Sequence, residues 1–351
     1  MKAVILAGGF GTRLRPLTLT TPKPLIPLAN KPAIAHIVEY LASHGFKEIV
    51  VTTNYQRERL ISFLSEKYSK SIRFQFPEEP SPLGTAGSVK NASLNETAFI
   101  IQGDNITDID IKKLISFHNS CGGLATIALM PVENPSLFGI AEIDESGKIE
   151  RFVEKPSPEN CFSNLASIGL YVIEPEAMEL VPENQPFDFA KDLFPILVRE
   201  EAIYGCTVEG FWTDIGTFEG YMKAHEWILR SNNDSNTEEA NIKDSEIDGF
   251  VAIGRDSVIE ESKIRGYVAI GENVHMRKCK IQDSVVFQDA KMMGAFVRGS
   301  ILAEKCIVNG GRIEKSIVGA FSYLQNANIF EEKISPFSVR GSVYVGSDRP
   351  T

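Results

Sequence analysis

Long apolar runs are missing from this sequence, and none approaches the roughly 20 residues of a membrane-spanning helix. Cysteine is scarce: its five residues are dispersed and never spaced as C-x-x-C, so we expect neither a disulfide framework nor a zinc knuckle. Positive charge is in deficit. The 351 residues carry 36 Lys and Arg against 46 Asp and Glu, and a net charge of −10 argues against a protein that coats nucleic acid or an anionic membrane.

The first residues do not have the pattern of a secretory leader. Their apolar stretch, residues 2–7, is shorter than the core of about 7–15 residues that a signal peptide needs. Together with the dispersed cysteines, this favours a protein of the reducing cytoplasm.

Several common motifs are absent as well. No G-x-x-x-x-G-K-[ST] occurs, and a dinucleotide fingerprint starting at Gly9 fails because its third glycine position is Leu14. The five histidines are scattered and none belongs to H-E-x-x-H, so the sequence does not indicate histidine chemistry.

What is present first is an alternation of strand and helix patterns from residue 1 to 230. Short apolar runs predict strands, and apolar residues at helical spacing predict helices. The predicted strands are 4–7, 49–53, 72–76 and 98–101, and the predicted helices are 32–44, 57–68, 111–119 and 221–229. This alternation predicts a Rossmann-like, doubly wound α/β domain that binds ligands at the carboxyl ends of its strands.

A polar stretch, 231–245, is predicted to be a linker, and the pattern changes beyond it. Val251-Ala-Ile-Gly recurs 17 residues later as Val268-Ala-Ile-Gly, and isoleucines repeat at the same interval at 247, 264 and 281. Short β segments at one fixed interval indicate a solenoid. Residues 246–351 resemble a left-handed parallel β-helix of hexapeptide repeats, which implies a homo-oligomer held by this domain. The alternative is a β-sandwich with accidental spacing.

The most informative stretch is a glycine loop that directly follows the first strand. Gly8, Gly9 and Gly11 allow a tight turn that brings backbone N–H groups against an anion. Arg13 can clamp phosphate oxygens and Lys23 can add a point charge. Because both lie among prolines and leucines, we expect them to be buried rather than solvated.

The full string resembles the signature G-G-x-G-T-R-L-x-P-L-T…P-K of the sugar-nucleotide pyrophosphorylases, or sugar-1-phosphate nucleotidylyltransferases. The resemblance implies that Arg13 and Lys23 are catalytic and contact the phosphates. It assigns nucleotide binding to Leu6, Ala7, Gly8, Gly9, Gly11, Thr12, Arg13 and Lys23.

Two aspartates fit a magnesium site. Phosphoryl-type displacement places negative charge on several oxygens, and Mg²⁺ is bound by one or two carboxylates plus substrate phosphates. Asp104 follows the strand at 98–101, and Asp214 lies in Phe211-Trp-Thr-Asp-Ile-Gly-Thr217. Both contexts resemble family motifs, which implies that Asp104 and Asp214 are catalytic metal ligands. Taken singly, either residue has the alternative of a helix N-cap or turn.

The stretch Pro77-Glu-Glu-Pro-Ser-Pro-Leu-Gly-Thr-Ala-Gly87 resembles the family segment that recognises the nucleobase. This implies nucleotide contacts by Glu79, Gly84 and Thr85. A glutamate, either Glu78 or Glu79, can accept the N1–H and N2–H₂ donors of guanine. The extra Ser81-Pro82 departs from the compact family form.

Three further segments resemble the sugar-phosphate pocket: Phe138-Gly139, Phe152-Val-Glu-Lys-Pro156 and Ser167-Ile-Gly169. The resemblance implies that Glu154 binds the sugar hydroxyls and that Lys155 binds the sugar phosphate. The family's usual N-A-G reads Ser167-Ile-Gly169 here, with a shorter polar side chain. The implied sugar-phosphate residues are Gly139, Glu154, Lys155, Ser167 and Gly169.

These motifs are together most similar to the mannose-1-phosphate guanylyltransferases of the family. The implied reaction transfers a nucleotidyl group from a nucleoside triphosphate to a sugar 1-phosphate, releasing pyrophosphate. Because a phosphate monoester is already an anion near pH 7, no proton-abstracting base is needed.

Three alternatives remain open. Glucose-1-phosphate thymidylyl-, uridylyl- and adenylyltransferases share nearly all of these residues. A bifunctional enzyme could add acyl transfer in the β-helix, where His275 is the only histidine. A regulatory homologue could act as a scaffold without catalysis.

Overall fold

The structure is a computed structural model that describes residues 1–79, 81–231 and 239–341. It divides into two compact units. One, called here the sheet unit, comprises residues 1–10 and 34–214. The other, called the solenoid unit, comprises residues 11–33 and 215–351. Residues 232–238 of the predicted linker lie outside the described residues, and the linear division at 230 and 246 stays a prediction.

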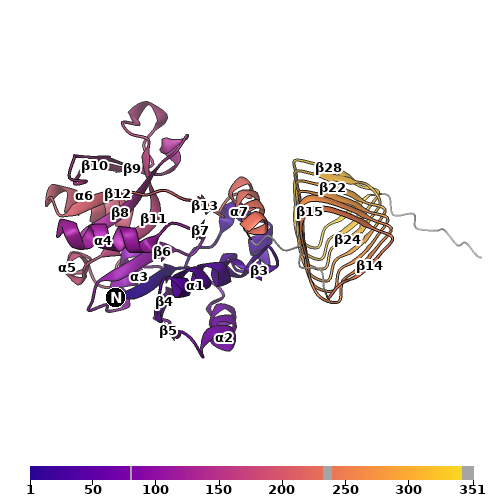
Figure 1. Ribbon diagram of the computed structural model, residues 1–351, viewed down its shortest axis with the longest axis horizontal. Helices are drawn as coiled ribbons and strands as arrows, with labels where there is room; N and C mark the ends of the chain where they lie inside the picture. Colours follow the sequence, from indigo (N-terminus) through magenta and orange to yellow (C-terminus); the bar gives the residue numbers. More distant parts are fainter. Residues whose placement is uncertain (80, 232–238, 342–351) are drawn as a thin grey trace, which may run out of the picture. The chain divides into compact units, whose positions relative to one another are not determined.

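The sheet unit is built on a nine-stranded mixed sheet (Figure 1). Its strands are β1 (Lys2–Leu6), β4 (Glu48–Thr52), β5 (Arg73–Gln75), β6 (Ala98–Gln102), β8 (Ala125–Pro131), β9 (Gly139–Ile143), β10 (Ile149–Glu154), β11 (Leu165–Ile173) and β12 (Ile203–Thr207). The strands β7 (Asn105–Thr107) and β13 (Trp212–Asp214) form a separate ribbon. The α-helices of this unit are α1 (Ala33–Ser43), α2 (Arg57–Tyr68), α3 (Gly84–Asn91), α4 (Ile111–Cys121), α5 (Pro175–Glu179) and α6 (Phe194–Arg199).

The predicted doubly wound topology is confirmed in the first half of this sheet. β5, β4, β1 and β6 are neighbours in that order, and all three pairings are parallel. The chain runs from β1 outward to β5 and then returns to β6 on the other side of β1. The strand order therefore reverses between β1 and β6, which is where open α/β sheets bind ligands. The second half differs from the prediction, because β11 runs antiparallel to β6.

Local sequence explains where the elements begin and end. α2 has the predicted bounds, whereas α1, α4 and α7 (Phe218–Ser231) differ from prediction by one to three residues at their ends. Asp110 caps α4 by accepting a hydrogen bond from the backbone N–H of Lys112, and Gly122 ends the helix with φ 69°. Within the described residues, no helix is long and apolar enough to cross a membrane.

The solenoid unit confirms the repeat. The strands of residues 241–341 pair in parallel, coil upon coil, which excludes a sandwich of antiparallel sheets (Figure 1, orange to yellow). Ile247 lies opposite Ile264, and Ile264 lies opposite Ile281, so the repeated isoleucines stack on one another. The later coils are one residue shorter, as Val285 pairs with Ile301. The handedness of the coil stays a prediction.

The strands that make these coils are short. They are β14 (Asn241–Lys243), β15 (Glu246–Ile253), β16 (Val258–Glu260), β17 (Lys263–Ile270), β18 (His275–Arg277), β19 (Lys280–Gln282), β20 (Val285–Val286), β21 (Lys291–Met293), β22 (Phe296–Arg298), β23 (Ile301–Leu302), β24 (Ile307–Asn309), β25 (Arg312–Glu314), β26 (Ile317–Val318), β27 (Tyr323–Gln325), β28 (Asn328–Phe330), β29 (Lys333–Ile334) and β30 (Val339–Gly341). Their inward aliphatic side chains form one continuous buried core.

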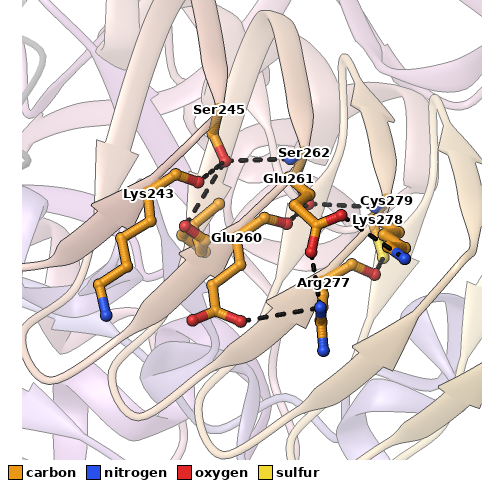
Figure 2. Close-up of polar contacts among 9 residues, drawn as sticks. Lys243, Ser245, Glu260, Glu261, Ser262, Arg277, Lys278 and Cys279 are labelled. Carbon is orange, nitrogen blue, oxygen red and sulfur yellow. Dashed lines mark hydrogen bonds and ion pairs between the residues drawn. The ribbon is translucent and has the colours of Figure 1, made fainter.

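A ladder of hydroxyl groups satisfies the backbone between successive coils (Figure 2). The Ser245 Oγ accepts a hydrogen bond from the N–H of Ser262 at 3.0 Å, and the Ser262 Oγ accepts one from the N–H of Cys279, also at 3.0 Å. Ser262 also donates to the carbonyl of Glu260. On the outside of the same coils, Arg277 pairs with Glu261. These serine hydroxyls thus accept hydrogen bonds from backbone N–H groups that apolar side chains at the same positions would leave unpaired.

Replacing Ser262 by alanine is expected to lower the free energy of unfolding by about 1–3 kcal/mol, because the buried N–H of Cys279 loses its acceptor. The measurement is chemical denaturation followed by circular dichroism. Ser120→Ala is the control: its exposed hydroxyl bonds only the carbonyl of Phe117, and the expected change is within about 0.5 kcal/mol. Equal effects of the two variants would contradict a role for the ladder.

Candidate functional site

The glycine loop leaves β1 at the reversal point of the sheet. The N–H of Ala7 donates to the carbonyl of Thr52 at 2.8 Å, which holds the chain onto β4 before the loop begins. A Cβ atom added at Gly8 or Gly9 would meet nothing within 4 Å among the described residues. Packing inside the protein therefore does not require glycine at these two positions. An open backbone face suits the close approach of a ligand.

The second half of the same motif belongs to the solenoid unit. Gly11 has φ 62°, and a Cβ there would lie 2.7 Å from Cγ2 of Thr18 and 3.2 Å from Cβ of Lys23. The Thr18 hydroxyl donates to the carbonyl of Gly11 at 2.9 Å. Lys23 is buried, with 8% of its surface exposed. Thr12 and Arg13 are exposed, so the expectation of a buried Arg13 is wrong: its turn lies at the surface.

The two predicted metal ligands are brought to neighbouring backbone positions. β6 ends at Gln102, a turn carries Gly103 and Asp104, and β7 starts at Asn105. β13 pairs antiparallel with β7, with Asp214 directly opposite Asn105. Asp214 therefore lies across the ribbon from the residue that follows Asp104, and both aspartates are half-buried.

Gly103 ties this turn to the end of β1. Its N–H donates to the carbonyl of Leu6 at 2.8 Å, and a Cβ at this position would lie 2.8 Å from the same oxygen. No side chain fits there without separating the strand ends. Leu6 and Asp104 are consequently held at the reversal point by adjacent backbones.

Residues that the sequence analysis missed hold the ribbon in place. Asn105 is buried, and its Nδ2 donates to the carbonyl of Ile168 at 2.6 Å, which links β7 to β11. The Oδ1 of Asp108 accepts a hydrogen bond from the N–H of Phe211 at 2.6 Å. An asparagine next to Gly-Asp was the available signal for the first; nothing in the sequence pattern pointed to Asp108.

Two of the predicted sugar residues, Glu154 and Lys155, lie beside Gly139. A Cβ there would lie 2.5 Å from Cζ of Phe152 and 2.7 Å from Oε2 of Glu154, so the ring and the carboxylate both lie against the glycine. Lys155 has φ 46° and its N–H donates to the carbonyl of Phe138. The Nζ of Lys155 is 3.5 Å from Oε1 of Glu154 and largely exposed. This arrangement presents one carboxylate and one ammonium group side by side.

Aromatic and phenolic side chains connect the sugar residues with the aspartates. The rings of Phe138 and Trp212 meet edge to face at 5.5 Å, and Trp212 is two residues before Asp214. Burial raises the pKa of Tyr171 to about 12, hydrogen bonds with Ser167 and Gln102 oppose the rise, and the charges of Glu154 and Asp104 add to it. Tyr171 thus stays protonated near neutral pH, and it is another residue that the sequence did not reveal.

The predicted base-recognition segment packs against residues 187–189. Gly84 has φ 71°, and a Cβ there would lie 2.7 Å from the carbonyl oxygen of Phe187. The N–H and the hydroxyl of Thr85 both donate to Oδ1 of Asp188. These bonds start α3, so the side chain of Thr85 is used inside the protein and its contact with a nucleotide stays a prediction.

Glu79 is the polar group best suited to a ligand in this segment. It is half-buried, and burial raises the pKa of its carboxyl, while a hydrogen bond with Ser88 opposes the rise. Its Oε1 is buried and has no hydrogen-bond partner among the described residues. A buried acceptor of this kind is costly unless a donor reaches it. The next residue, Pro80, lies outside the described residues.

The residues fit a Mg²⁺ ion that is coordinated partly by the protein and partly by the phosphates of the substrate. Among the residues that the structure describes, no group of three or more His, Cys, Asp or Glu is placed to hold a metal. Two aspartates on adjacent backbones match the one or two carboxylates that Mg²⁺ takes when phosphates complete its coordination. The role of Asp104 and Asp214 as ligands stays a prediction.

Comparison with known proteins decides the family. The model of the family described as Nucleotidyl transferase matches residues 2–231. The chain belongs to this family. Its nucleotidyl transferase region therefore includes the whole sheet unit, the glycine-loop segment and α7, and its solenoid strands lie outside the matched residues.

Relatives of the nucleotidyl transferase region carry consistent names. It is 40% identical over 240 residues to the mannose-1-phosphate guanyltransferase of Saccharomyces cerevisiae, which covers 66% of this chain and 65% of that protein. It is 39% identical over 230 residues to mannose-1-phosphate guanylyltransferase 1 of Arabidopsis thaliana, with 63% of each chain covered. The chain thus spans slightly less than two thirds of these relatives.

A solved structure is similar as well. A protein of Bacillus anthracis described as a glucose-1-phosphate thymidylyltransferase, in complex with sucrose, superposes with a TM-score of 0.59 at 27% identity. The match covers 65% of this chain and 94% of that one.

The glycine under Glu154 gives a specific prediction. Gly139→Ala is expected to raise KM for a sugar 1-phosphate about tenfold, the loss of roughly one charged hydrogen bond, because the new methyl group displaces the carboxylate. KM for the nucleotide should stay the same. Steady-state kinetics with each substrate varied in turn measures both.

Gly123→Ala is the matched control for this change. Gly123 lies between α4 and β8 of the same unit, and its Cβ would press on the ring of Tyr204 at 2.5 Å, which is not a predicted site residue. It should lose stability without changing either KM. An unchanged sugar-phosphate KM in Gly139→Ala would remove Glu154 from the sugar site.

Proposed function

We propose that the protein transfers a guanylyl group from GTP to mannose 1-phosphate, releasing pyrophosphate and forming GDP-mannose. The family membership and the names of the relatives support nucleotidyl transfer to a sugar phosphate. The observation that carries the proposal is the β7–β13 ribbon, which sets Asp214 opposite the residue after Asp104 at the reversal point of the sheet.

Each group of residues has its own role in the proposed reaction. Asp104 and Asp214 would hold Mg²⁺, which when bound would supply positive charge to the phosphate oxygens. The backbone N–H groups of Gly8 and Gly9 face the triphosphate, whose charge is balanced by Arg13 and Lys23. No side chain has to remove a proton, because the attacking phosphate oxygen is already anionic.

The sugar phosphate is oriented by the cluster at Gly139. Glu154 accepts hydrogen bonds from the sugar hydroxyls, and the exposed Nζ of Lys155 contacts the phosphate. Ser167 is proposed to act with this cluster through its hydrogen bond with Tyr171, and Gly169 through its close approach to Gln102. Catalysis then consists of positioning and electrostatic stabilisation of the transition state.

Guanine is favoured by the buried Oε1 of Glu79, which has no hydrogen-bond partner among the described residues. The Watson–Crick edge of guanine offers two neighbouring donors, N1–H and N2–H₂, whereas that of uracil or thymine offers one, N3–H, between two carbonyl oxygens. The solenoid is proposed to hold a homo-oligomer, with no nucleic acid or membrane partner, in the cytoplasm.

The deciding experiment is a pyrophosphate-release assay on the full chain with Mg²⁺. GTP, ATP, UTP and dTTP are each combined with mannose, glucose and glucosamine 1-phosphates. We expect the highest kcat/KM for GTP with mannose 1-phosphate. A different leading pair would overturn the substrate assignment, and no release with any pair would overturn the enzyme assignment in favour of a scaffold.

A further inference from the structure

The cationic part of the signature belongs to the same compact unit as α7 and the solenoid strands. Residues 11–33, which carry Arg13 and Lys23, cluster with residues 215–351. Yet the same residues lie inside the matched nucleotidyl transferase region, 2–231. Specific hydrogen bonds hold this segment on the solenoid.

A small hairpin makes the first contact. β2 (Pro27–Leu28) and β3 (Lys31–Pro32) pair antiparallel, and the turn between them has Ala29 at φ 48° and Asn30 at φ 64°. The Nδ2 of Asn30 donates to the carbonyl of Ile270 at 2.7 Å and to that of Ala252 at 3.2 Å.

These two carbonyls belong to successive coils, since β15 and β17 are paired neighbours. The one side-chain amide therefore uses both of its hydrogens to bridge two turns of the solenoid. The Tyr221 hydroxyl of α7 adds a hydrogen bond to the carbonyl of Pro27 in the same hairpin.

A second contact lies at the other end of the segment. The Nζ of Lys333, at the start of β29, donates to the backbone carbonyl of Arg13 at 3.1 Å. The solenoid thus touches the segment at the residue that carries the exposed guanidinium and again at the hairpin that follows Lys23.

We propose that Asn30 and Lys333 are positioning residues through which the solenoid sets the backbone that carries Arg13 and Lys23. The inference rests on the proposed function, since it assigns those two cations to the nucleoside triphosphate. An exposed arginine keeps its direction only if its backbone is held, and a preorganised cation binds phosphate at lower entropic cost. The solenoid then contributes to nucleotide binding as well as to assembly.

The test uses Asn30→Asp and Lys333→Met in the full chain. Aspartate tolerates the left-handed turn but directs an oxygen at two carbonyl oxygens. Methionine keeps a long apolar side chain and removes the ammonium group. We expect each variant to raise the Kd for Mg-GTP, measured by calorimetry without sugar phosphate, about fivefold to tenfold, the loss of about one hydrogen bond.

A KM for mannose 1-phosphate that stays within about twofold of the wild type distinguishes positioning from general damage. Asn273→Asp is the control for the first variant, since Asn273 is an exposed solenoid residue with φ 55°. Lys315→Met is the control for the second, since the Nζ of Lys315 bonds Glu331 within the solenoid. Neither control should change the Kd.

Each outcome bears on a different proposal. A wild type that releases no pyrophosphate with any substrate pair overturns the proposed function. An active wild type whose variants keep the wild-type nucleotide Kd and KM overturns the positioning role. If Asn30→Asp does not fold, Asn30→Gly, which allows the same turn without the amide, takes its place, and Lys333→Met gives an independent result.

Discussion

Asp104→Asn is expected to lower kcat about 10²–10³-fold, the size of effect seen when one preorganised electrostatic contact is lost from a transition state. The amide keeps the shape of the side chain but removes the charge that Mg²⁺ needs. Stability should change little, because Asp104 lies in a half-buried turn between β6 and β7. Single-turnover kinetics at saturating substrates and Mg²⁺ isolates the step, and calorimetric unfolding checks the fold.

Asp110→Asn provides the control for that experiment. Asp110 lies six residues further along and caps α4 through the N–H of Lys112. Asparagine caps helices about as well as aspartate, so both activity and stability should be retained. A normal kcat in Asp104→Asn would reject Asp104 as a metal ligand, whatever the substrate.

Gly169→Ala is expected to lower the free energy of unfolding by about 3 kcal/mol, by adding backbone strain to a steric clash. Gly169 has φ 76°, and its Cβ would lie 2.6 Å from Cγ of Gln102 and 2.9 Å from Nδ2 of Asn105. Both neighbours flank Gly103 and Asp104. The change should therefore also reduce kcat/KM at temperatures where the variant is folded. Denaturation and initial-rate assays measure the two effects.

Gly122→Ala separates the two causes. Gly122 has a similar φ of 69°, but a Cβ there would meet nothing within 4 Å among the described residues. It should cost about 1 kcal/mol through backbone strain alone and leave activity unchanged. If both variants lost the same stability and the same activity, the contact of Gly169 with Gln102 and Asn105 would have no role.

Local patterns were sufficient for most of the fold. β1, β4 and β6 are runs of aliphatic residues buried on both faces, so they could be recognised without knowledge of their partners. The solenoid was recognisable because every coil repeats the same inward positions, and stacked isoleucines need a fixed interval. The antiparallel half of the sheet was missed, because strands such as β9 and β10 have no helix between them to mark a crossover.

Part of the chemistry of the site could be predicted from the sequence. The string around Gly8, Arg13 and Lys23, together with Asp104 and Asp214, was recognisable because those residue types occur at motif spacing. The exposure of Arg13 could not be predicted, because apolar neighbours in the sequence do not determine which face of a turn is exposed to solvent. Tyr171 and Asp108 could not be predicted, because Gln102, Asp104 and Phe211, with which they interact, lie far away along the chain.

By itself, then, the order of residues determined which segments become strands, helices and coils, and which side chains carry the charge for phosphate chemistry. Only the tertiary structure decided that Asp214 lies opposite Asn105 and that Asn30 bridges two coils of the solenoid. The physical reason is the range of the forces involved. Periodic burial acts over a few residues and leaves a pattern, whereas a strand pairing across more than one hundred residues depends on how complete elements pack.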